Sequence, residues 1–387
     1  MTFVFSSDSH LVEPKEIFDD GLPASLKKFG IRSERQGDHI CTLAGEKVLH
    51  RTRIIKREAP PAPADDVDNE TRGLKLESGE DVVRLHAPAR GHNNIALRLE
   101  DMKLDGIDAE ISFPSTCLWA YGIEHPETEL ATAQIYNDWN NKLLGPHPDI
   151  FIRCGVLPVR DFNNTQMEMK RIAKMGFTSA MIPCVTAPDM PRYNDPAWDP
   201  VFELAGELGV VLVMHSGTGL ETVQPERRAG GAVINYTNQA CDAWNSIQYL
   251  VAGGMLDRYP KAQVAVIECG ASWLAGLVER MDEIYIAHDA YVRPKLSLMP
   301  SEIVARQVSC GFQNDRACIL TRSVTTTRPL IWGSDYPHAE GTYPRSKAVI
   351  ERLFKGIEIS EKDKADILGG NAARLFRLQR PEFMKAA

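Results

Sequence analysis

Residues 178–216 read TSAMIPCVTAPDMPRYNDPAWDPVFELAGELGVVLVMHS. An apolar run at 178–185 is followed by a helical pattern at 196–209, which ends on Gly209, a residue type that often terminates helices. A second apolar run follows at 210–216. Both runs are continuous rather than alternating, as expected for strands that are covered on both faces. The stretch therefore predicts a strand–helix–strand unit with parallel strands.

The same alternation continues through most of the chain. Further strands are expected at 106–114, 151–159, 262–270 and 329–338, and a weaker one at 307–312. Further helices are expected at 127–145, 164–176, 272–288, 343–354 and 361–376. With the opening run Phe3–Phe5 there are about eight strands, which predicts a distorted (β/α)8 TIM barrel. The alternative is a doubly wound open sheet. Such a sheet normally carries a Gly-rich loop after its first strand, and SSDSHLVEP at 6–14 is not one.

The region from about 14 to 97 interrupts this rhythm. Residues 38–56 predict a β-hairpin with Gly45 near its turn. Residues 57–70 are Pro-rich and acidic, which is typical of a loop. We expect an insertion after the first strand, within a single domain of residues 1–387. It would lie over the carboxyl-terminal face of the barrel as a cap or an oligomer contact.

Composition restricts the class of protein. The chain has 387 residues, of which 43% are hydrophobic and 25% charged, so a large core is available. The net charge is −8 and no long Lys/Arg cluster occurs, which argues against binding nucleic acid or an anionic membrane surface. No apolar run approaches the roughly 20 residues of a membrane helix, and no signal-peptide pattern is evident. We expect a cytoplasmic protein with eight reduced, mostly buried cysteines and no zinc knuckle.

Polar side chains end several of the apolar runs, where a TIM barrel places its active site. Asp8 and His10 follow the first run two residues apart, so that they point to the same side of an extended strand. His215 and Asp335 end two later runs. Imidazole and carboxylate ligands without thiolate suit zinc, manganese or iron(II). The sequence predicts one divalent ion bound by Asp8, His10, His215 and Asp335, and zinc is the first candidate.

Each of these residues also has a local explanation. A single histidine after a strand is more often a structural hydrogen-bonding residue. Gly333 could relax the backbone of a turn, and Asp335 could then cap the next helix. Glu268, which follows the run at 262–267, could be the partner of an arginine, a general acid/base, or a carboxylate that holds metal-activated water. Burial near other carboxylates would raise its pKa.

Three further residues are candidates for contact with a small-molecule substrate. Arg51 and Arg53 on the predicted hairpin could clamp a substrate carboxylate, although solvated charges on an exposed strand are the simpler explanation. His338, three residues after Asp335, is expected to contact the substrate as well. We assign catalysis to Asp335, Glu268 and His215.

Several segments together resemble a known family. They are DSHLVEP (8–14), DPAWDPVFELAGELGVVLVMHSG (195–217), VAVIECGASWLAGLVERMDE (264–283), VRPKLSLMPSEI (292–303), LIWGSDYPHAEGTYP (330–344) and ILGGNAARLF (367–376). The chain resembles the amidohydrolase-2 family, in its branch similar to aminocarboxymuconate-semialdehyde decarboxylase. This resemblance implies a distorted (β/α)8 barrel with one divalent metal. Its ligands would fall on Asp8, His10, His215 and Asp335.

The resemblance also implies a chemistry. Many members decarboxylate aromatic or unsaturated acids without an organic cofactor, others hydrolyse or hydrate, and members are often dimers. We therefore expect metal-dependent, non-oxidative decarboxylation of a small carboxylic acid in a homodimer or a larger homo-oligomer. Metal-dependent hydrolysis of a C–N, C–O or C–C bond is the alternative, and a non-catalytic metal-binding barrel is a third possibility. Well-studied decarboxylases of the family carry a histidine after strand 6, where this chain has Glu268 and Cys269.

Overall fold

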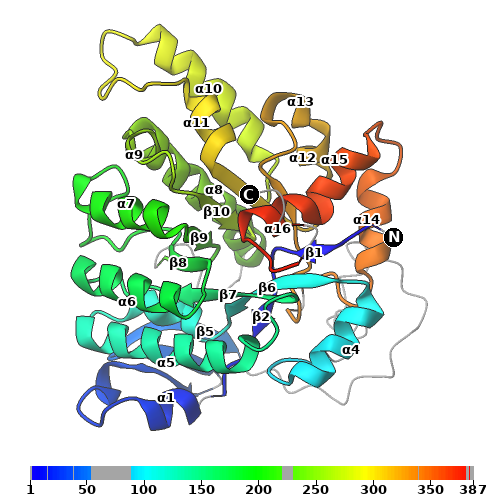
Figure 1. Cartoon of the computed structure of the whole chain (residues 1–387). Coiled ribbons are helices and arrows are strands. Elements are labelled where there is room, and N and C mark those ends of the chain that lie inside the picture. Colours follow the sequence, from blue (N-terminus) through cyan, green and yellow to red (C-terminus); the bar gives the residue numbers. More distant parts are fainter. Residues whose placement is uncertain are drawn as a thin grey trace.

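The strands of one large parallel sheet lie at the centre of the molecule and helices surround them (Figure 1). The structure is a computed structural model that describes residues 2–14, 16–37, 39–53, 89–219, 230–338, 340–380 and 383. The strands of the central sheet are β1 (Phe5–Ser6), β2 (His10–Leu11), β6 (Ala109–Pro114), β7 (Phe151–Val156), β8 (Ser179–Pro183), β9 (Val211–His215), β10 (Val264–Ile267), β11 (Val308–Phe312) and β12 (Leu330–Trp332).

These strands form a ring in chain order. The first strand is interrupted, and its two pieces, β1 and β2, both pair with β6. Each following strand pairs in parallel with the next one, as far as β12. The ring closes where the Ser7 N–H donates to the Trp332 carbonyl and the Asp335 N–H donates to the Asp8 carbonyl, both at 2.8 Å. The predicted TIM barrel is therefore confirmed, and the doubly wound sheet is wrong because an open sheet would leave its outer strands unpaired.

The helices pack around this ring (Figure 1). Most of the longer ones match the predicted helical patterns, but α4 (Ile95–Asp105) and α8 (Gly231–Ala252) were not predicted. In α8 the apolar residues are interspersed with many polar ones. The helices are α1 (Glu16–Gly21), α4 (Ile95–Asp105), α5 (Pro126–Leu144), α6 (Phe162–Lys174), α7 (Asp199–Leu208), α8 (Gly231–Ala252), α9 (Met255–Arg258), α10 (Trp273–Ala287), α11 (Pro300–Gln307), α12 (Arg316–Leu320), α13 (Arg322–Thr325), α14 (Ser346–Phe354), α15 (Glu361–Ala365) and α16 (Asn371–Leu375). Short helical turns are η1 (Lys27–Phe29), η2 (Cys117–Gly122), η3 (Pro196–Trp198) and the π-helical η4 (Asp366–Gly370).

Burial explains the continuous apolar runs. Every residue of β6, β7, β8, β9, β10 and β11 is buried, because one face of each strand points into the barrel and the other meets the helices. All eight cysteines are free thiols, and only Cys241 is exposed, as expected from the sequence. In the described part of the chain, no helix is long and apolar enough to cross a membrane.

A separate antiparallel sheet follows the first barrel strand. It consists of β3 (Ile31–Gln36), β4 (His39–Ala44) and β5 (Lys47–Arg53), in that order. The predicted hairpin is confirmed as β4 and β5, with Gly45 in its turn at a φ of 57°. The largely polar β3 was not predicted. His50 stacks on Trp119 of η2 with ring centroids 5.3 Å apart, so the sheet contacts the barrel domain there. The predicted loop at 57–70 lies outside the described residues, and the role of this insertion as a cap stays a prediction.

Gly333 is needed for the closure of the barrel. A Cβ at this position would lie 2.5 Å from the Asp8 Cβ and 2.8 Å from the Asp8 nitrogen. The glycine therefore permits the last strand to approach the first one. The alternative that Gly333 serves to ease the backbone of a turn is wrong. Nor does Asp335 cap a helix, since the next helix, α14, begins only at Ser346.

Gly333→Ala is therefore expected to lower the free energy of unfolding by about 1–3 kcal/mol, the usual effect of forcing an extra methyl group into a packed site. Urea denaturation measures this. Gly276→Ala is the matched control, because the nearest atom to a Cβ at Gly276 in α10 is 3.9 Å away. Alanine there should be neutral or stabilise the helix by up to about 1 kcal/mol. Equal losses in the two variants would contradict the close contact between Gly333 and Asp8.

Candidate metal centre

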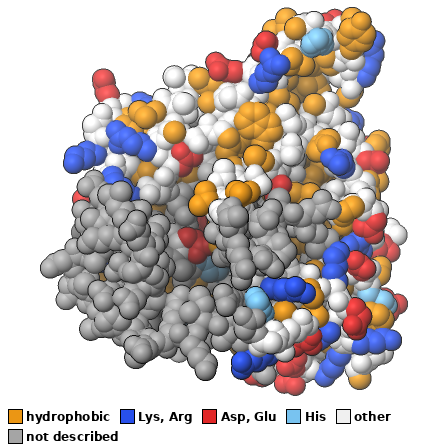
Figure 2. Space-filling model, turned by 180° about the vertical axis from the view of Figure 1, so that it is seen from behind, with side chains coloured by type: hydrophobic (Ala, Val, Ile, Leu, Met, Phe, Trp, Pro, Cys, Tyr) orange, Lys and Arg blue, Asp and Glu red, His pale blue; other side chains and the backbone are white. Residues whose placement is uncertain are grey.

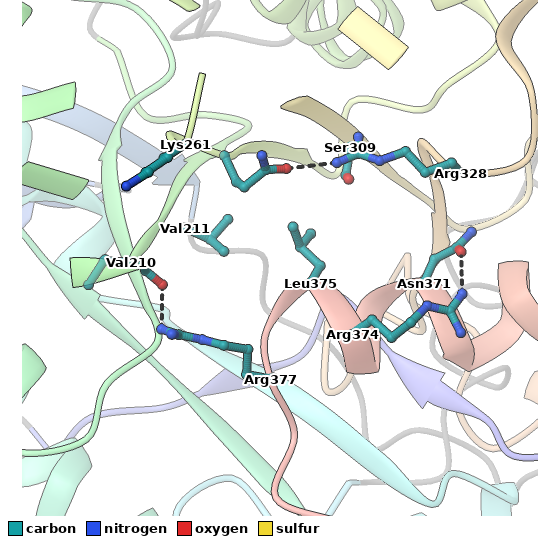
Figure 3. A pocket seen from close by; sticks show the side chains of 11 residues that line it. Val210, Val211, Lys261, Ser309, Arg328, Asn371, Arg374, Leu375 and Arg377 are labelled. Carbon is teal, nitrogen blue, oxygen red and sulfur yellow. Dashed lines mark hydrogen bonds between the residues drawn. The ribbon is translucent and has the colours of Figure 1, made fainter. Parts of the chain in front are cut away.

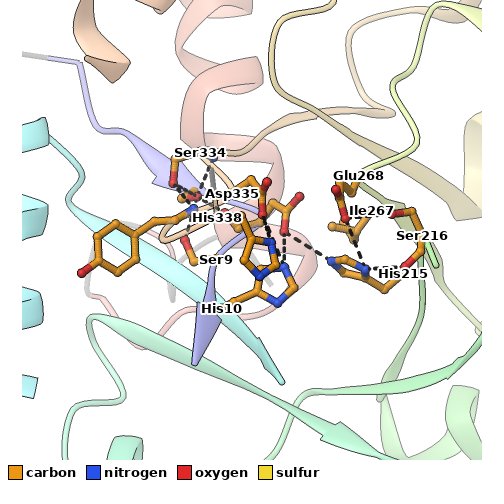
Figure 4. Close-up of polar contacts among 12 residues, drawn as sticks. Ser9, His10, His215, Ser216, Ile267, Glu268, Ser334, Asp335 and His338 are labelled. Carbon is orange, nitrogen blue, oxygen red and sulfur yellow. Dashed lines mark hydrogen bonds and ion pairs between the residues drawn. The ribbon is translucent and has the colours of Figure 1, made fainter. Parts of the chain in front are cut away.

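Four polar side chains converge at the carboxyl ends of the barrel strands. Asp8 lies between β1 and β2, His10 begins β2, His215 ends β9, and Asp335 follows β12. The Asp8 Oδ1 atom lies 3.4 Å from His10 Nε2 and 3.5 Å from His215 Nε2. The Asp335 Oδ1 atom lies 3.5 Å from His10 Nε2 (Figure 4). The structure thus brings Asp8, His10 and His215 together as one group of possible metal ligands, and Asp335 joins this group through His10. All four residues that were predicted as ligands are buried.

The polar atoms at the centre of this cluster lack hydrogen-bond partners. Among the residues that the structure describes, both carboxylate oxygens of Asp8, and the Nε2 atoms of His10 and His215, are buried without a hydrogen bond. Buried polar groups normally find a partner, because leaving one unsatisfied costs about 1–3 kcal/mol. Ligand atoms bound tetrahedrally at zinc distances of about 2.0–2.2 Å would lie roughly 3.3–3.6 Å from one another. The observed spacing of 3.4–3.5 Å fits a divalent cation at this point.

The two imidazole rings are oriented by backbone carbonyls. The Nδ1–H of His10 donates to the Pro114 carbonyl at 2.8 Å, and the Nδ1–H of His215 donates to the Ser216 carbonyl at 2.9 Å. Because a carbonyl only accepts, Nδ1 carries a proton in each ring, and Nε2 is the nitrogen that faces the cluster. Outer contacts of this kind are typical of metal-binding histidines.

The charges of the cluster also suit a cation. Burial, together with the charge of His338, lowers the pKa of His10 to about 3, which leaves the ring neutral. Burial alone would also lower the pKa of His215, yet its contact with Asp8 raises it to about 9. Burial would raise the pKa of Asp8, but His10 and His215 hold it well below its usual range. A divalent cation would compete with the proton on His215, so that metal binding would release a proton.

Two carboxyl groups at this site have raised pKa values: Glu268, which lies beside the cluster, and Asp335, which belongs to it. Burial and the charge of Asp335 raise the pKa of Glu268 to about 8. Burial likewise raises the pKa of Asp335 to about 7, although His338 opposes the shift. The Ser216 hydroxyl donates to Glu268 Oε2 at 2.7 Å, and this oxygen lies 3.7 Å from His215 Nδ1. Glu268 can therefore hold a proton near neutral pH, as a general acid must.

The backbone is strained at two of these residues. Glu268 has a φ of 60° and Asp335 a φ of 57°, which are left-handed values that non-glycine residues seldom adopt. Both residues follow a barrel strand, so the sharp change of direction aims their side chains at the cluster. Such strain is often found at functional sites, where the surrounding structure maintains it.

The predicted substrate-contacting residues differ in their placement. His338 stacks on His10 with ring centroids 4.0 Å apart, and its Nδ1 lies 2.9 Å from Asp335 Oδ1. Its side chain is 29% exposed, so it lies at the solvent side of the cluster. Arg51 lies on β5 with an exposed side chain. Arg53 ends β5, and its side chain lies outside the described part of the structure.

Sequence reasoning missed a buried ion pair that supports His10. Arg98 of α4 is fully buried, and its Nε–H donates to the Glu110 carboxylate of β6. The Arg98 Nη1–H donates to the His10 carbonyl at 2.7 Å, so the pair holds the backbone that carries this ligand. The one available signal was Glu110 itself, an acid within the apolar run AEISF.

Comparisons with known proteins agree with this fold. The chain is 23% identical, over 74% of its own length and 78% of the relative's, to 2-amino-3-carboxymuconate-6-semialdehyde decarboxylase of Dictyostelium discoideum. An amidohydrolase from Mycobacterium avium subsp. paratuberculosis has a similar structure, with a TM-score of 0.76, 20% identity and coverage of 97% of this chain and 99% of that one. A 5-carboxyvanillate decarboxylase from Novosphingobium aromaticivorans, with bound manganese and 3-methoxy-4-hydroxy-5-nitrobenzoic acid, has a TM-score of 0.67, 17% identity and coverage of 97% of both chains. Because the family model Amidohydro_2, described as amidohydrolase, matches residues 83–378, the chain belongs to the amidohydrolase family.

Proposed function

We propose that this protein is a metal-dependent decarboxylase that acts on a small aromatic or unsaturated carboxylic acid. Two of the similar proteins described above are named as decarboxylases, which supports this reaction type. The observation that carries the proposal is the position of Glu268. A carboxyl group whose pKa is raised to about 8 lies directly beside a buried cluster of unsatisfied metal-ligand atoms.

In this proposal Asp8, His10, His215 and Asp335 hold one divalent ion. Zinc is the first candidate, because it accepts imidazole and carboxylate ligands at tetrahedral spacing. Manganese, which the Novosphingobium aromaticivorans structure contains, and iron(II) are the alternatives. When bound, the ion supplies Lewis-acid charge that attracts a substrate carboxylate and a neighbouring oxygen.

The proton is supplied by Glu268. Its carboxyl O–H donates a proton to the carbon atom that bears the substrate carboxylate. The bond from this carbon to the carboxylate then breaks, its electron pair returns to the ring or double bond, and CO2 leaves. Glu268 recovers a proton from water, so each turnover consumes one proton and releases one CO2. A carboxyl group with a pKa of about 8 carries this proton at neutral pH.

Three residues are proposed to contact the substrate. His338 lies at the solvent side of the cluster and would donate a hydrogen bond to a substrate oxygen. Burial would lower the pKa of His338, but its contact with Asp335 raises this pKa to about 9, so the ring carries a proton to donate. Arg51 and Arg53 would approach from β5 and pair with a substrate carboxylate.

Hydrolysis is the second candidate, because position 268 carries a glutamate where the family resemblance leads us to expect a histidine. Well-studied decarboxylases of the family carry a histidine at this position. In this chain the carboxyl group of Glu268 would replace the imidazole as the proton donor. In a hydrolase, Asp335 would accept the proton of an attacking water and Glu268 would protonate the leaving group. The two reactions share the metal ligands and differ in their products.

A substrate screen of metal-reconstituted protein separates these reactions. The panel should contain hydroxybenzoic acids and unsaturated dicarboxylic acids on one side, and small lactones and amides on the other. We expect CO2 in a one-to-one ratio with the decarboxylated product. Acid formation without CO2 would favour the hydrolase. No product from either group with metal-loaded protein would favour the non-catalytic barrel.

We also propose that the protein is a homodimer or a larger homo-oligomer in the cytoplasm. The loop between α10 and α11 projects from the molecule and carries exposed apolar side chains (Figure 2). In this loop Tyr291 is 83% exposed, and Ile286 at the end of the preceding helix α10 is 68% exposed. Such residues favour a contact with another chain. Sedimentation equilibrium measures the oligomeric state.

A further inference from the structure

A cavity lies at the opposite end of the barrel from the metal centre. Its volume is about 360 Å³, and it opens beside the amino-terminal ends of β9, β10, β11 and β12 (Figure 3). Val211 at the start of β9 lines it, whereas His215 at the end of the same strand belongs to the metal centre. The two ends of this strand are separated by about 13 Å at the usual rise per residue. The cavity is therefore distinct from the proposed active site.

The walls of this cavity are basic. Lys261, Arg328, Arg374 and Arg377 line it, and no carboxylate side chain of the described residues does. Arg374 is neutralised by Asp366 at 2.6 Å. Within the residues that the structure describes, the other three cations form no ion pair with an acid. This concentration of positive charge contrasts with the net charge of −8 of the whole chain.

Arg328 is held rigidly in the wall. Its Nη2–H donates to Gln263 Oε1 at 2.7 Å, and its Nη1–H donates to the Val308 carbonyl at 2.8 Å. The partial burial of this guanidinium lowers its pKa. A partly desolvated cation without a counter-charge is unfavourable, and an anion in the cavity would offset this cost.

Arg377 is positioned in a similar way. Its guanidinium donates to the Gly209 carbonyl. Gly209 has a φ of 64°, and a Cβ there would lie 2.7 Å from a nitrogen of Arg377, so that only glycine permits this approach. Arg377 itself has a left-handed φ of 55°. Two guanidinium groups are thus fixed at the cavity by contacts that leave their charge unbalanced.

We propose that this cavity binds phosphate, either as the free ion or as the phosphate group of a small molecule. Guanidinium forks match the tetrahedral oxygens of phosphate, and Lys261 adds a third charge. Three unbalanced cations suit a dianion better than a single carboxylate. The volume exceeds that of one phosphate ion, and Val210 and Leu375 offer apolar contacts to the remainder of a phosphorylated molecule.

Isothermal titration of the metal-loaded full chain with inorganic phosphate tests this site, with sodium chloride keeping the ionic strength constant. We expect one phosphate per chain, and at least 10-fold weaker binding in Arg328→Gln. Arg306→Gln is the matched control, because Arg306 is also partly buried and donates to a glutamine oxygen and a backbone carbonyl. Glycerol 3-phosphate, titrated in parallel, distinguishes the two sources. Tighter binding than that of phosphate identifies a phosphorylated molecule, and weaker binding identifies the free ion.

Two further measurements keep the proposal open to refutation. If Arg328→Gln does not fold, Lys261→Ala removes an exposed charge of the same cavity and should weaken phosphate binding at least 3-fold. Removal of the divalent ion with a chelator should leave phosphate binding unchanged. Binding that persists in the cavity variants but disappears with the metal would place phosphate at the metal centre and overturn the proposal. The absence of any phosphate binding would overturn it equally.

Discussion

His215→Ala is expected to lose most of the bound divalent ion, and with it the turnover of the enzyme. The Nε2 atom of His215 lies 3.5 Å from Asp8 Oδ1 and has no hydrogen bond within the described part of the chain, so alanine removes one corner of the cluster. Loss of an outer contact to a metal ligand costs about 10–100-fold in metal affinity, and loss of the ligand itself should cost more. Elemental analysis after dialysis measures the metal content per chain, which should be about one ion in the unaltered protein.

His288→Ala is the control for this variant. His288 lies at the end of α10 and is exposed, so its removal should change neither metal content nor turnover. Full metal occupancy and full turnover in His215→Ala would show that the ion, if present, is bound elsewhere. Loss of metal in both variants would point to general instability, which a thermal melt would detect.

Glu268→Gln is expected to lower turnover by about 100-fold or more while the metal content stays unchanged. Glutamine keeps the shape of the side chain and can still accept a hydrogen bond from Ser216, but it cannot deliver a proton. The expected loss is that of a general acid/base. Steady-state kinetics and elemental analysis on the same preparation measure the two quantities.

Glu129→Gln is the matched control. Burial raises the pKa of Glu129 to about 7, and its carboxylate accepts hydrogen bonds from the backbone N–H groups of Val159 and Arg160. It is thus a buried carboxyl with a raised pKa that belongs to none of the clusters able to hold a metal in the described chain. Its replacement should leave turnover near that of the unaltered protein. If Glu268→Gln also loses the metal, Glu268 is a ligand or supports one, and if turnover stays normal, Glu268 has only a structural role.

The sequence by itself determined the ring of strands and the residues at its carboxyl end. Continuous apolar runs alternate with helical patterns, and this alternation requires parallel strands because each helix returns the chain to the same edge. Once the strands are parallel, the polar residues that follow them must lie on one side of the barrel. Asp8, His10, His215 and Asp335 could therefore be predicted together, although His10 and Asp335 are 325 positions apart.

Only the tertiary structure decided how these residues are held and what lies at the other end of the barrel. Pro114 orients the ring of His10, Arg98 binds the carbonyl of His10, and Gly333 leaves room for Asp8. In the same way, Arg328 and Arg377 reach one cavity from different segments of the chain. Each of these contacts joins residues far apart in the sequence, and their geometry depends on packing across the closed barrel. Local periodicity carries no information on such distances, so a pattern within one segment could not reveal them.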